Sequence, residues 1–248
     1  MKEVILITGS SRGIGAATAL LAARQGYAVC VNYARDAQAA GELCARIVAE
    51  GGEAIAVQAD VSYEADVARL FAEVDARLGI LTALVNNVGV LEQKCRLVDM
   101  SAQRLERVLR TNVISYFLCC QQAVRRMSTA NGGQGGRIVN VSSAAARLGS
   151  PGEYIDYAAS KGAVDTLTVG LAKEVAAEGV RVNGVRPGII YTDIHASGGE
   201  PGRVARLAPG VPMLRGGQPE EIADAIVYLL GPGASYVTGS ILDVAGGR

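Results

Sequence analysis

Short apolar runs alternate along the chain with longer segments in which apolar residues recur at helical spacing. The short runs contain β-branched residues and little charge, which is typical of strands buried on both faces of a parallel sheet. Seven such runs predict seven strands, at residues 4–8, 27–32, 54–58, 81–86, 137–141, 180–185 and 240–244.

Two of the longer segments carry a clear amphipathic helix pattern with spacings of three and four residues. The first pattern consists of Val67, Leu70, Phe71, Val74 and Leu78, and the second of Ile222, Ala225, Ile226, Leu229 and Leu230. Pro219, Glu220 and Glu221 suit the start of the second helix. The alternation of strands and helices predicts one α/β domain over residues 1–248. We expect a doubly wound (Rossmann) fold with a seven-stranded parallel sheet and helices on both faces.

Two stretches interrupt the alternation. Residues 131–136 read NGGQGG and predict a flexible surface loop before the fifth strand. Residues 191–212 contain three prolines and four glycines, and a loop of this length in a compact domain is often a lid or a binding segment. We therefore expect a substrate lid at about 191–212.

Charge and composition narrow the class of protein. The formal net charge is zero, so neither a nucleic-acid footprint nor a polybasic membrane anchor is indicated. No apolar run approaches the roughly 20 residues of a membrane span. The five cysteines are odd in number and lack zinc spacing, which predicts free thiols, no metal site and a cytoplasmic location. The start of the chain does not resemble a signal peptide.

The first predicted strand runs directly into the sequence Thr8-Gly9-Ser10-Ser11-Arg12-Gly13-Ile14-Gly15. Glycines let the backbone approach a pyrophosphate, and the helix that follows would offer free N–H groups and its positive dipole end. A tight turn without a ligand is the alternative, and the position between first strand and first helix disfavours it. The predicted cofactor contacts here are Gly9, Ser11, Arg12, Gly13, Ile14 and Gly15.

The second strand bears on the choice of cofactor. An NAD site usually has Asp or Glu about 20 residues after the glycine loop, where this chain has Asn32 and Tyr33. The guanidinium groups of Arg12 and Arg35 suit a 2′-phosphate. We therefore favour NADP(H), with Tyr33 and Arg35 among its contacts. NAD(H) stays possible, because Asp36 could turn toward the ribose and Arg35 could equally be a solvated residue at a helix start.

Tyr157 and Lys161 lie four residues apart, which places both on one face of a helix. An ammonium beside a phenol should lower the phenol pKa from about 10. Such a phenol can exchange a proton with a carbonyl or alcohol during hydride transfer. A chance pair on a helix surface is the alternative. Tyr154 has no lysine four residues on and does not share the pattern.

Taken together, the motifs resemble the short-chain dehydrogenase/reductase family over nearly the whole chain. The glycine loop matches its dinucleotide motif, and Asn86-Asn87-Val88-Gly89 is similar to its Asn-Asn-Ala-Gly stretch. Diffuse similarity points to the glucose-dehydrogenase-like and 3-oxoacyl-reductase-like branch. Further matching positions are Asp60-Val61 at the adenine, Asn112, Ser143, Tyr157 and Lys161 at the catalytic tetrad, and Pro187-Gly188 with Thr192 at the nicotinamide.

The resemblance implies a role for each of these residues. Tyr157 would be the general acid or base, and Lys161 would bind the nicotinamide ribose and tune Tyr157. Ser143 would hydrogen-bond the substrate oxygen, and Asn112 would hold a water that links Lys161 to solvent. The remaining implied cofactor contacts are Asp60, Val61, Asn87, Gly89, Pro187, Gly188, Ile190 and Thr192.

Two departures from the family pattern stand out. Val88 replaces the usual alanine, so a small backbone shift is expected there. The spacing from Ser143 to Tyr157 is one residue longer than usual, which we assign to an insertion within residues 150–156. Ser142 competes with Ser143 for the substrate, and strand geometry allows only one of the two to face it.

Three functions remain open. The first is an oxidoreductase of sugars, polyols or similar small carbonyls and alcohols. The second is a 3-oxoacyl-thioester reductase, whose substrate would need basic residues near the entrance. The third is a non-catalytic NADP(H) sensor or scaffold, which the presence of Tyr157 and Lys161 disfavours. Candidates for the basic entrance are Arg125, Arg126, Arg147, Arg203 and Arg206.

His195 is the only histidine, and a histidine-dependent hydrolase would have to use it. No Gly-x-Ser-x-Gly motif supports such a hydrolase. We expect His195 to be a polar loop residue, and Glu200, Arg203 and Arg206 to face water.

An excess of apolar residues on two predicted helices indicates an interface. They lie in segment 158–175 and in segment 104–127, where they are Leu105, Val108, Leu109, Val113, Ile114, Tyr116, Phe117 and Leu118. Members of the resembled family usually form tetramers through helices at these positions, so we predict a homotetramer.

Overall fold

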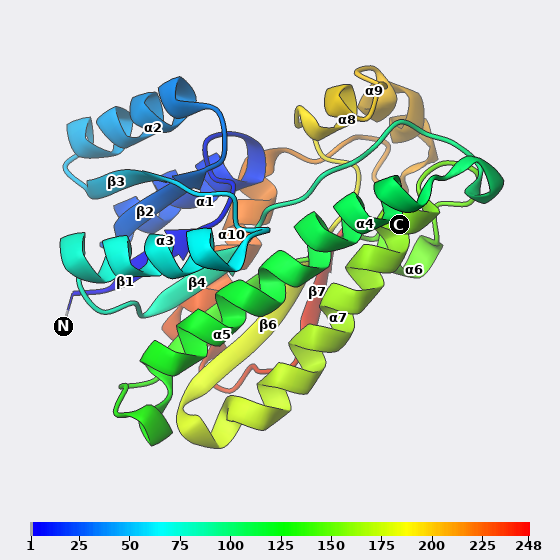
Figure 1. Cartoon of the computed structure of the whole chain (residues 1–248). Helices are drawn as coiled ribbons and strands as arrows, with labels where there is room; N and C mark the ends of the chain where they lie inside the picture. The colour runs from blue at the N-terminus through cyan, green and yellow to red at the C-terminus, as the bar shows by residue number, and fades with distance from the viewer. Residues whose placement is uncertain (1) are drawn as a thin grey trace.

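The seven predicted strands form one sheet in the computed structural model, which describes residues 2–248 (Figure 1). All neighbouring pairs are parallel, in the order β3-β2-β1-β4-β5-β6-β7. The predicted fold class is thereby confirmed, with strand ends within two residues of those expected. The strands are β1 (Val4–Ile7), β2 (Ala28–Tyr33), β3 (Glu53–Gln58), β4 (Ala83–Asn86), β5 (Gly136–Val141), β6 (Val180–Pro187) and β7 (Ile241–Val244).

Each face of the sheet has its own apolar core, because successive side chains of a strand point to opposite faces. Val4 and Leu6 of β1 pack in one core, and Ile5 and Ile7 pack in the other. The first core includes α3 (Glu64–Arg77), α5 (Ser115–Met127) and α7 (Ile155–Val175). The second includes α1 (Gly13–Arg24), α2 (Ala37–Ala49) and α10 (Pro219–Leu230). The continuous apolar strands thus have a cover on both sides.

The two amphipathic patterns form helices as predicted. In α3, Val67, Leu70, Phe71 and Val74 are buried. In α10, the buried residues include Ile222, Ile226, Leu229 and Leu230, and the Glu221 carboxylate accepts the Gln218 N–H at 2.8 Å at the helix start.

Shorter elements complete the chain. The helix α4 (Ala102–Leu109) passes through a π-helical turn, η2 (Arg110–Ile114), directly into α5. The others are α6 (Ala145–Leu148), α8 (Ile194–Ser197), α9 (Arg203–Leu207), and the 3₁₀ turns η1 (Leu97–Asp99), η3 (Thr129–Asn131), η4 (Ala176–Glu178), η5 (Ala208–Gly210) and η6 (Pro232–Ala234). None of the helices within residues 2–248 is long and apolar enough to cross a membrane.

The loop predicted at 131–136 lies at the surface, with Asn131, Gly132 and Gln134 exposed, and some of its glycines also allow close approach of the backbone. Gly135 has φ +84°, and a Cβ there would lie 2.6 Å from the carbonyl oxygen of Gly179. A Cβ on Gly133 would overlap the backbone of Met127, and Gly136 already belongs to β5. Gly133, Gly135 and Gly136 therefore permit close approach of the backbone at this surface turn.

Residues 191–212 follow the carboxyl end of β6 and contain α8, α9 and η5 (gold in Figure 1). The predicted long loop is therefore folded into short helices joined by turns. We call residues 191–212 the lid segment below.

Candidate active site

The predicted cofactor residues gather along the edge formed by the carboxyl ends of the strands. The glycine loop follows β1, Arg35 follows β2, Asp60 follows β3 and Asn87 follows β4. The chain order reverses between β1 and β4, since β2 and β3 lie on one side of β1 and β4 to β7 on the other. In open α/β sheets, ligands bind in the crevice at such a reversal.

The glycine loop needs its glycines. Gly9 has φ +60°, and a Cβ there would lie 2.8 Å from a methyl group of Val88. A Cβ on Gly15 would lie 2.7 Å from the side-chain nitrogen of Asn87, which donates to the carbonyls of Thr8 and Gly9 at 3.0 Å. The larger Val88 is thus accommodated against a residue that has no side chain. The helix α1 begins at Gly13 and so presents its first-turn N–H groups to this crevice.

Folding brings Thr192, far along the sequence, to the same loop. A Cβ on Gly13 would lie 3.3 Å from the Thr192 methyl carbon. Ile190 is buried. A Cβ on Gly188 would lie 2.7 Å from the Cα of Ala245, so the chain leaves no room for a side chain at Gly188.

Asp36 is engaged at the start of α2. Its carboxylate accepts the Ala39 N–H at 3.0 Å and caps the helix. Arg35 and Arg12 are exposed at the ends of adjacent strands, and Tyr33 is half-buried. One oxygen of the acidic side chain that could have favoured a ribose hydroxyl is therefore engaged in a helix cap.

Asp60 has a fixed carboxylate, which accepts hydrogen bonds from the Ser62 backbone at 3.0 Å and from its hydroxyl at 2.7 Å. The Asp60 N–H donates to Asp66 at 2.8 Å, and Val61 is buried beside it. The pair is thus held rigidly at the end of β3.

Lys161 is buried beneath the edge of the sheet on α7. Its ammonium donates to the Val141 carbonyl at 2.8 Å and to the Tyr116 hydroxyl at 3.3 Å. A Cβ on Gly89 would lie 3.7 Å from the Lys161 Nζ and 3.9 Å from the Asn112 Oδ1, so the structure brings these three predicted residues together. Tyr116 was missed as a site residue. In the sequence it is only one of several large side chains on its helix.

Asn112 lies in the π-helical turn η2, a feature that the sequence pattern did not indicate. Its carboxamide accepts the Val90 N–H at 2.8 Å and donates to the Val90 carbonyl and the Ser160 hydroxyl, each at 3.1 Å. The side chain therefore joins the segment after β4 to helix α7. π-Turns inside α-helices are frequent at functional sites.

The prediction that Lys161 lowers the pKa of Tyr157 is wrong. Burial raises the pKa of Tyr157, while a hydrogen bond from Ser143 and the charge of Arg203 lower it in part. Burial also lowers the pKa of Lys161 to about 7, so its charge is only partial at neutral pH. Its Nζ lies 5.7 Å from the centre of the Tyr157 ring. Tyr157 is therefore a protonated phenol at neutral pH.

The two competing serines have different surroundings. Ser142 is buried, and its hydroxyl donates to the Lys161 carbonyl at 3.2 Å. Ser143 lines a cavity of about 360 Å³ together with Leu148, Pro151 and Leu207, among others. Its hydroxyl also accepts the Ala145 N–H at 3.1 Å. This arrangement favours Ser143 as the serine that meets a substrate.

We expect Ser143→Ala to lower kcat for carbonyl reduction by about 100-fold, the usual cost of losing one donor to a developing negative charge. Ser142→Ala is the matched control and should retain turnover, with a stability loss of about 1 kcal/mol. Steady-state kinetics on both variants distinguish them. Loss of turnover in Ser142→Ala alone would reverse the assignment.

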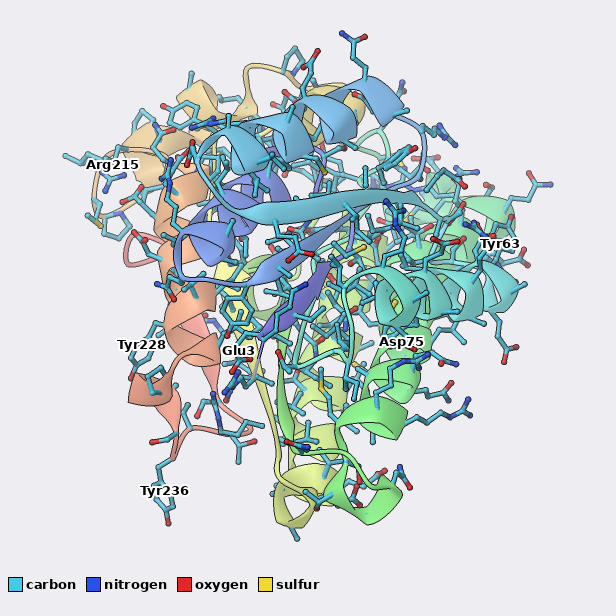
Figure 2. All side chains as sticks on the ribbon, turned by 90° about the vertical axis from the view of Figure 1, so that its left-hand side faces the viewer. Glu3, Tyr63, Asp75, Arg215, Tyr228 and Tyr236 are labelled. Atoms are coloured by element: carbon cyan, nitrogen blue, oxygen red, sulfur yellow. The ribbon has the colours of Figure 1, made fainter. Side chains whose placement is uncertain are left out.

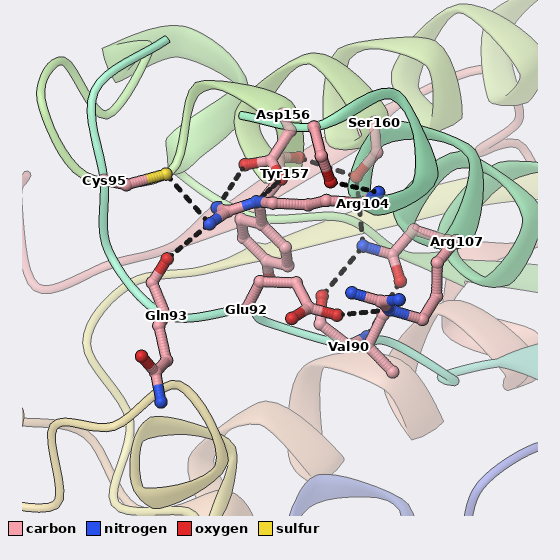
Figure 3. Close-up of polar contacts among 11 residues, drawn as sticks. Val90, Glu92, Gln93, Cys95, Arg104, Arg107, Asp156, Tyr157 and Ser160 are labelled. Atoms are coloured by element: carbon pink, nitrogen blue, oxygen red, sulfur yellow. Dashed lines mark hydrogen bonds and ion pairs between the residues drawn. The ribbon is translucent and has the colours of Figure 1, made fainter. Parts of the chain in front are cut away.

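A buried ion pair flanks Tyr157. Arg104 of α4 binds Asp156 with two hydrogen bonds, Nε to Oδ2 at 2.7 Å and Nη2 to Oδ1 at 3.1 Å. The remaining nitrogen, Nη1, donates to the Gln93 carbonyl and contacts the Cys95 sulfur (Figure 3). One guanidinium thus joins α4, the start of α7 and the segment after β4.

Two predictions for residues of the lid segment are wrong. Arg203, expected to face water, is 8% exposed and forms ion pairs with Glu153 and Glu200. His195, expected to be a polar loop residue, is buried in α8, where its Nε2 lies 3.0 Å from the Ile190 carbonyl. Arg206 is exposed as expected but pairs with both glutamates. The spacing of Glu200, Arg203 and Arg206 was compatible with this cluster, but the sequence could not supply Glu153.

Comparison with known proteins shows the family of the chain. A family model described as Enoyl-(Acyl carrier protein) reductase matches residues 9–248. A solved short-chain dehydrogenase/reductase from Serratia marcescens is 33% identical, covers 99% of this chain and 97% of its own, and superimposes with a TM-score of 0.91. The chain belongs to the short-chain dehydrogenase/reductase family.

Other known proteins are also similar to the chain. The uncharacterized oxidoreductase YgfF of Escherichia coli K12 is 60% identical over 99% of both chains. A 3-oxoacyl-[acyl-carrier-protein] reductase of Synechocystis is 40% identical over 99% of this chain and 96% of its own. A blue fluorescent protein from a metagenomic library, solved in complex with NADPH, is 33% identical, covers 99% of this chain and 97% of its own, and has a TM-score of 0.90. The short-chain dehydrogenase/reductase described here is therefore an oxidoreductase.

Proposed function

We propose that this oxidoreductase transfers a hydride between NADP(H) and a small carbonyl or secondary alcohol, with Tyr157 as general acid in reduction and general base in oxidation. The observation that carries the proposal is the half-buried, protonated Tyr157 next to Ser143, whose hydroxyl lines a cavity of about 360 Å³. When bound, the nicotinamide would supply or accept the hydride, and the protein would orient it and polarise the substrate.

The other residues receive supporting roles. Ser143 would donate a hydrogen bond to the substrate oxygen as charge develops there. Lys161 would bind the nicotinamide ribose, and its pKa of about 7 suits a group that passes protons onward near neutral pH. Asn112 would hold the relay water to Lys161 while its carboxamide fixes Val90. The glycine loop, Asp60-Val61, Asn87, Gly89 and the 187–192 strand end would hold the cofactor.

NADP(H) is the proposed cofactor, and two observations support it. The capping role of Asp36 engages one oxygen of the nearby carboxylate that would suit a ribose hydroxyl. Arg12 and Arg35 are exposed at neighbouring strand ends, and neither forms an ion pair within residues 2–248. Both guanidinium groups are available to a 2′-phosphate. The NADPH complex of the similar blue fluorescent protein is consistent with this choice.

We expect Arg35→Ala to lower kcat/KM for NADPH by about 10- to 100-fold, the cost of one lost hydrogen bond to a charged group. Values for NADH should change little, because NADH has no 2′-phosphate. Arg46→Ala is a control on α2, the helix that follows Arg35, since Arg46 only pairs with Glu50 at the surface. A lower KM for NAD than for NADP in the wild type would contradict the preference.

A small substrate is favoured over a thioester carried on a phosphopantetheine arm. Four of the five arginines considered for a basic entrance are neutralised by carboxylates: Arg126 by Asp75, Arg147 by Asp243, and Arg203 and Arg206 by Glu153 and Glu200. Arg125 lies in the last turn of α5, at the opposite end of that helix from η2, the turn that carries Asn112. The 3-oxoacyl relatives keep the thioester as the second candidate.

A substrate panel separates the candidates. NADPH oxidation would be followed with α-diketones, quinones, acetoacetyl thioesters and enoyl thioesters, and NADP reduction with sugars and polyols. We expect turnover with small carbonyls or polyols above that with thioesters. Tight NADPH binding without turnover on the whole panel would instead indicate a sensor or scaffold.

We propose a homotetramer as the working assembly. On α4 to α5, Leu109, Ile114 and Phe117 are each more than 40% exposed, whereas Val108 and Tyr116 proved to be buried. Tyr228 and Tyr236 are also exposed and project at the lower left of the view in Figure 2. Exposed apolar groups of this size are typical of interfaces. Sedimentation as a monomer at micromolar concentration would refute the proposal.

We also propose a cytoplasmic location. All five cysteines are free thiols, and Cys30, Cys119 and Cys120 are buried. Free buried thiols suit a reducing compartment. Recovery of the protein in a secreted or periplasmic fraction would contradict this.

A further inference from the structure

Arg203 is a buried charged residue that the proposed chemistry does not use. Its guanidinium forms ion pairs with Glu153 at 2.6 Å and Glu200 at 3.1 Å, and lies 4.7 Å from the centre of the Tyr154 ring. Glu200 belongs to the lid segment, like Arg203 itself. Glu153 and Tyr154 immediately precede α7, the helix that carries Tyr157. Arg203 therefore connects the lid segment to the start of that helix.

This connection lies at the rim of the substrate cavity. Glu153 lines the cavity next to Ser143, and so does Leu207, one helical turn after Arg203 on α9. The Glu153 carbonyl also accepts the Cys95 N–H at 3.1 Å, which brings the segment after β4 to the same place. Movement of Arg203 would therefore disturb one wall of the cavity.

The charge of Arg203 also reaches the proposed acid. The charge of Arg203 lowers the pKa of Tyr157. Burial, which raises this pKa, has the largest effect, and the hydrogen bond from Ser143, which also lowers it, comes second. The titratable groups around the guanidinium are Glu153, Glu200, Tyr154, His195 and Tyr157. Position and charge thus act on the same catalytic group.

We propose that Arg203 is a positioning residue, which clamps the lid segment over the substrate cavity through Glu153 and fixes the start of α7 so that Tyr157 and Ser143 face one substrate oxygen. The proposal rests on the function proposed above. A planar guanidinium suits the task, because it bonds two carboxylates in fixed directions and stacks on an aromatic ring.

Arg206 provides a matched control within the same cluster. It pairs with the same two carboxylates, Glu200 at 2.5 Å and Glu153 at 3.3 Å, but its side chain is 47% exposed. It does not stack on Tyr154. Because Arg206 stays in place when Arg203 is replaced, both carboxylates keep a cation, and Arg203→Met should fold.

The experiment compares Arg203→Met, Arg203→Lys and Arg206→Met in the full-length protein. With the best carbonyl of the panel, Arg203→Met should lower kcat/KM by about 10- to 100-fold, mainly through KM, since it loses charged hydrogen bonds that hold the cavity wall. The alkaline limb of its kcat/KM profile should move to higher pH, because a positive charge near the phenol is lost. Arg203→Lys should keep the wild-type limb but not the wild-type KM. Arg206→Met should change kcat/KM by less than about threefold.

Limited proteolysis of the same variants gives a readout that does not depend on turnover. We expect faster cleavage within residues 191–212 in Arg203→Met and wild-type rates in Arg206→Met. Should Arg203→Met not fold, Glu153→Gln removes the ion pair between Glu153 and Arg203 from the α7 side. It should raise both KM and the rate of proteolytic cleavage.

Two results would refute the positioning role proposed for Arg203. One is wild-type KM, pH profile and protease resistance in Arg203→Met or Glu153→Gln. The other is an equal loss in Arg203→Met and Arg206→Met, which would indicate a general surface-charge effect. If the wild type reduces no carbonyl, the proposed function fails, while proteolysis still decides whether Arg203 clamps the lid segment.

Discussion

Tyr157→Phe should lower kcat for carbonyl reduction by about 10²- to 10⁴-fold, which is the usual contribution of a positioned general acid. The substitution removes only the hydroxyl, so the ring continues to fill its place on α7 near Lys161. NADPH affinity should stay within about threefold, because the other cofactor contacts remain. Stopped-flow reduction and fluorescence titration with NADPH measure the two effects separately.

The pH dependence tests the same assignment. Burial raises the pKa of Tyr157, so the phenol holds its proton through neutral pH. Reduction needs that proton, and its kcat/KM should stay high at neutral pH and fall only on the alkaline side. Oxidation needs the phenolate, so its kcat/KM should rise as the pH increases above neutral. Opposite trends would contradict Tyr157 as the acid and base.

Tyr154→Phe is the matched control for Tyr157→Phe. Tyr154 lies three residues earlier, and its buried hydroxyl has no hydrogen-bond partner within residues 2–248. Its removal should therefore cost little stability, and the ring stays to contact Arg203. If Tyr154→Phe loses as much kcat as Tyr157→Phe, the loss reflects packing and not proton transfer.

Arg104→Met should lower the free energy of unfolding by about 3–5 kcal/mol, because it leaves the Asp156 carboxylate buried without its partner. The two side chains are only 10% and 2% exposed, and the pair is bidentate (Figure 3). Loss of the pair also frees the start of α7, so kcat should fall as well. Urea unfolding at one fixed protein concentration measures the first effect, since assembly would shift the apparent stability.

Arg107→Met is the control for Arg104→Met. Arg107 lies one turn further along α4 and pairs with Glu92 at 2.6 Å, but its side chain is 55% exposed. Its removal should cost less than about 1 kcal/mol. The double variant Arg104→Met/Asp156→Leu should recover much of the loss, because no uncompensated charge remains buried. Equal destabilisation by Arg104→Met and Arg107→Met would contradict the argument.

Local sequence patterns identified many residues of the candidate site. Gly9 and Gly15 were recognisable because they belong to a glycine motif directly after the first strand. The structure gives the physical reason for them, since a side chain at either position would collide with Val88 or Asn87. Tyr157 and Lys161 were recognisable because four residues is one helical turn. Ser143 needed more, since only the packing of Ser142 against the Lys161 carbonyl distinguishes the two serines.

Electrostatic surroundings were where sequence reasoning failed. The spacing of Lys161 and Tyr157 suggested a depressed phenol pKa, but the Lys161 ammonium is held by the Val141 carbonyl. Burial lowers the pKa of Lys161 to about 7 and raises that of Tyr157. A pKa depends on burial and on every nearby charge, including Arg203, which lies 46 positions after Tyr157 in the chain.

The sequence by itself determined the order of strands and helices, the doubly wound sheet, the glycine loop between β1 and α1 and the placement of Tyr157 and Lys161 on one helix. These features depend on periodicity or on residues a few positions apart, which a linear chain records directly. The tertiary structure alone decided that Glu153 meets Arg203, that Arg104 meets Asp156, that Asp36 caps a helix and that Tyr116 contacts Lys161. Those contacts arise because strands and helices far apart in the chain are packed together, and no local pattern specifies which side chains then become neighbours.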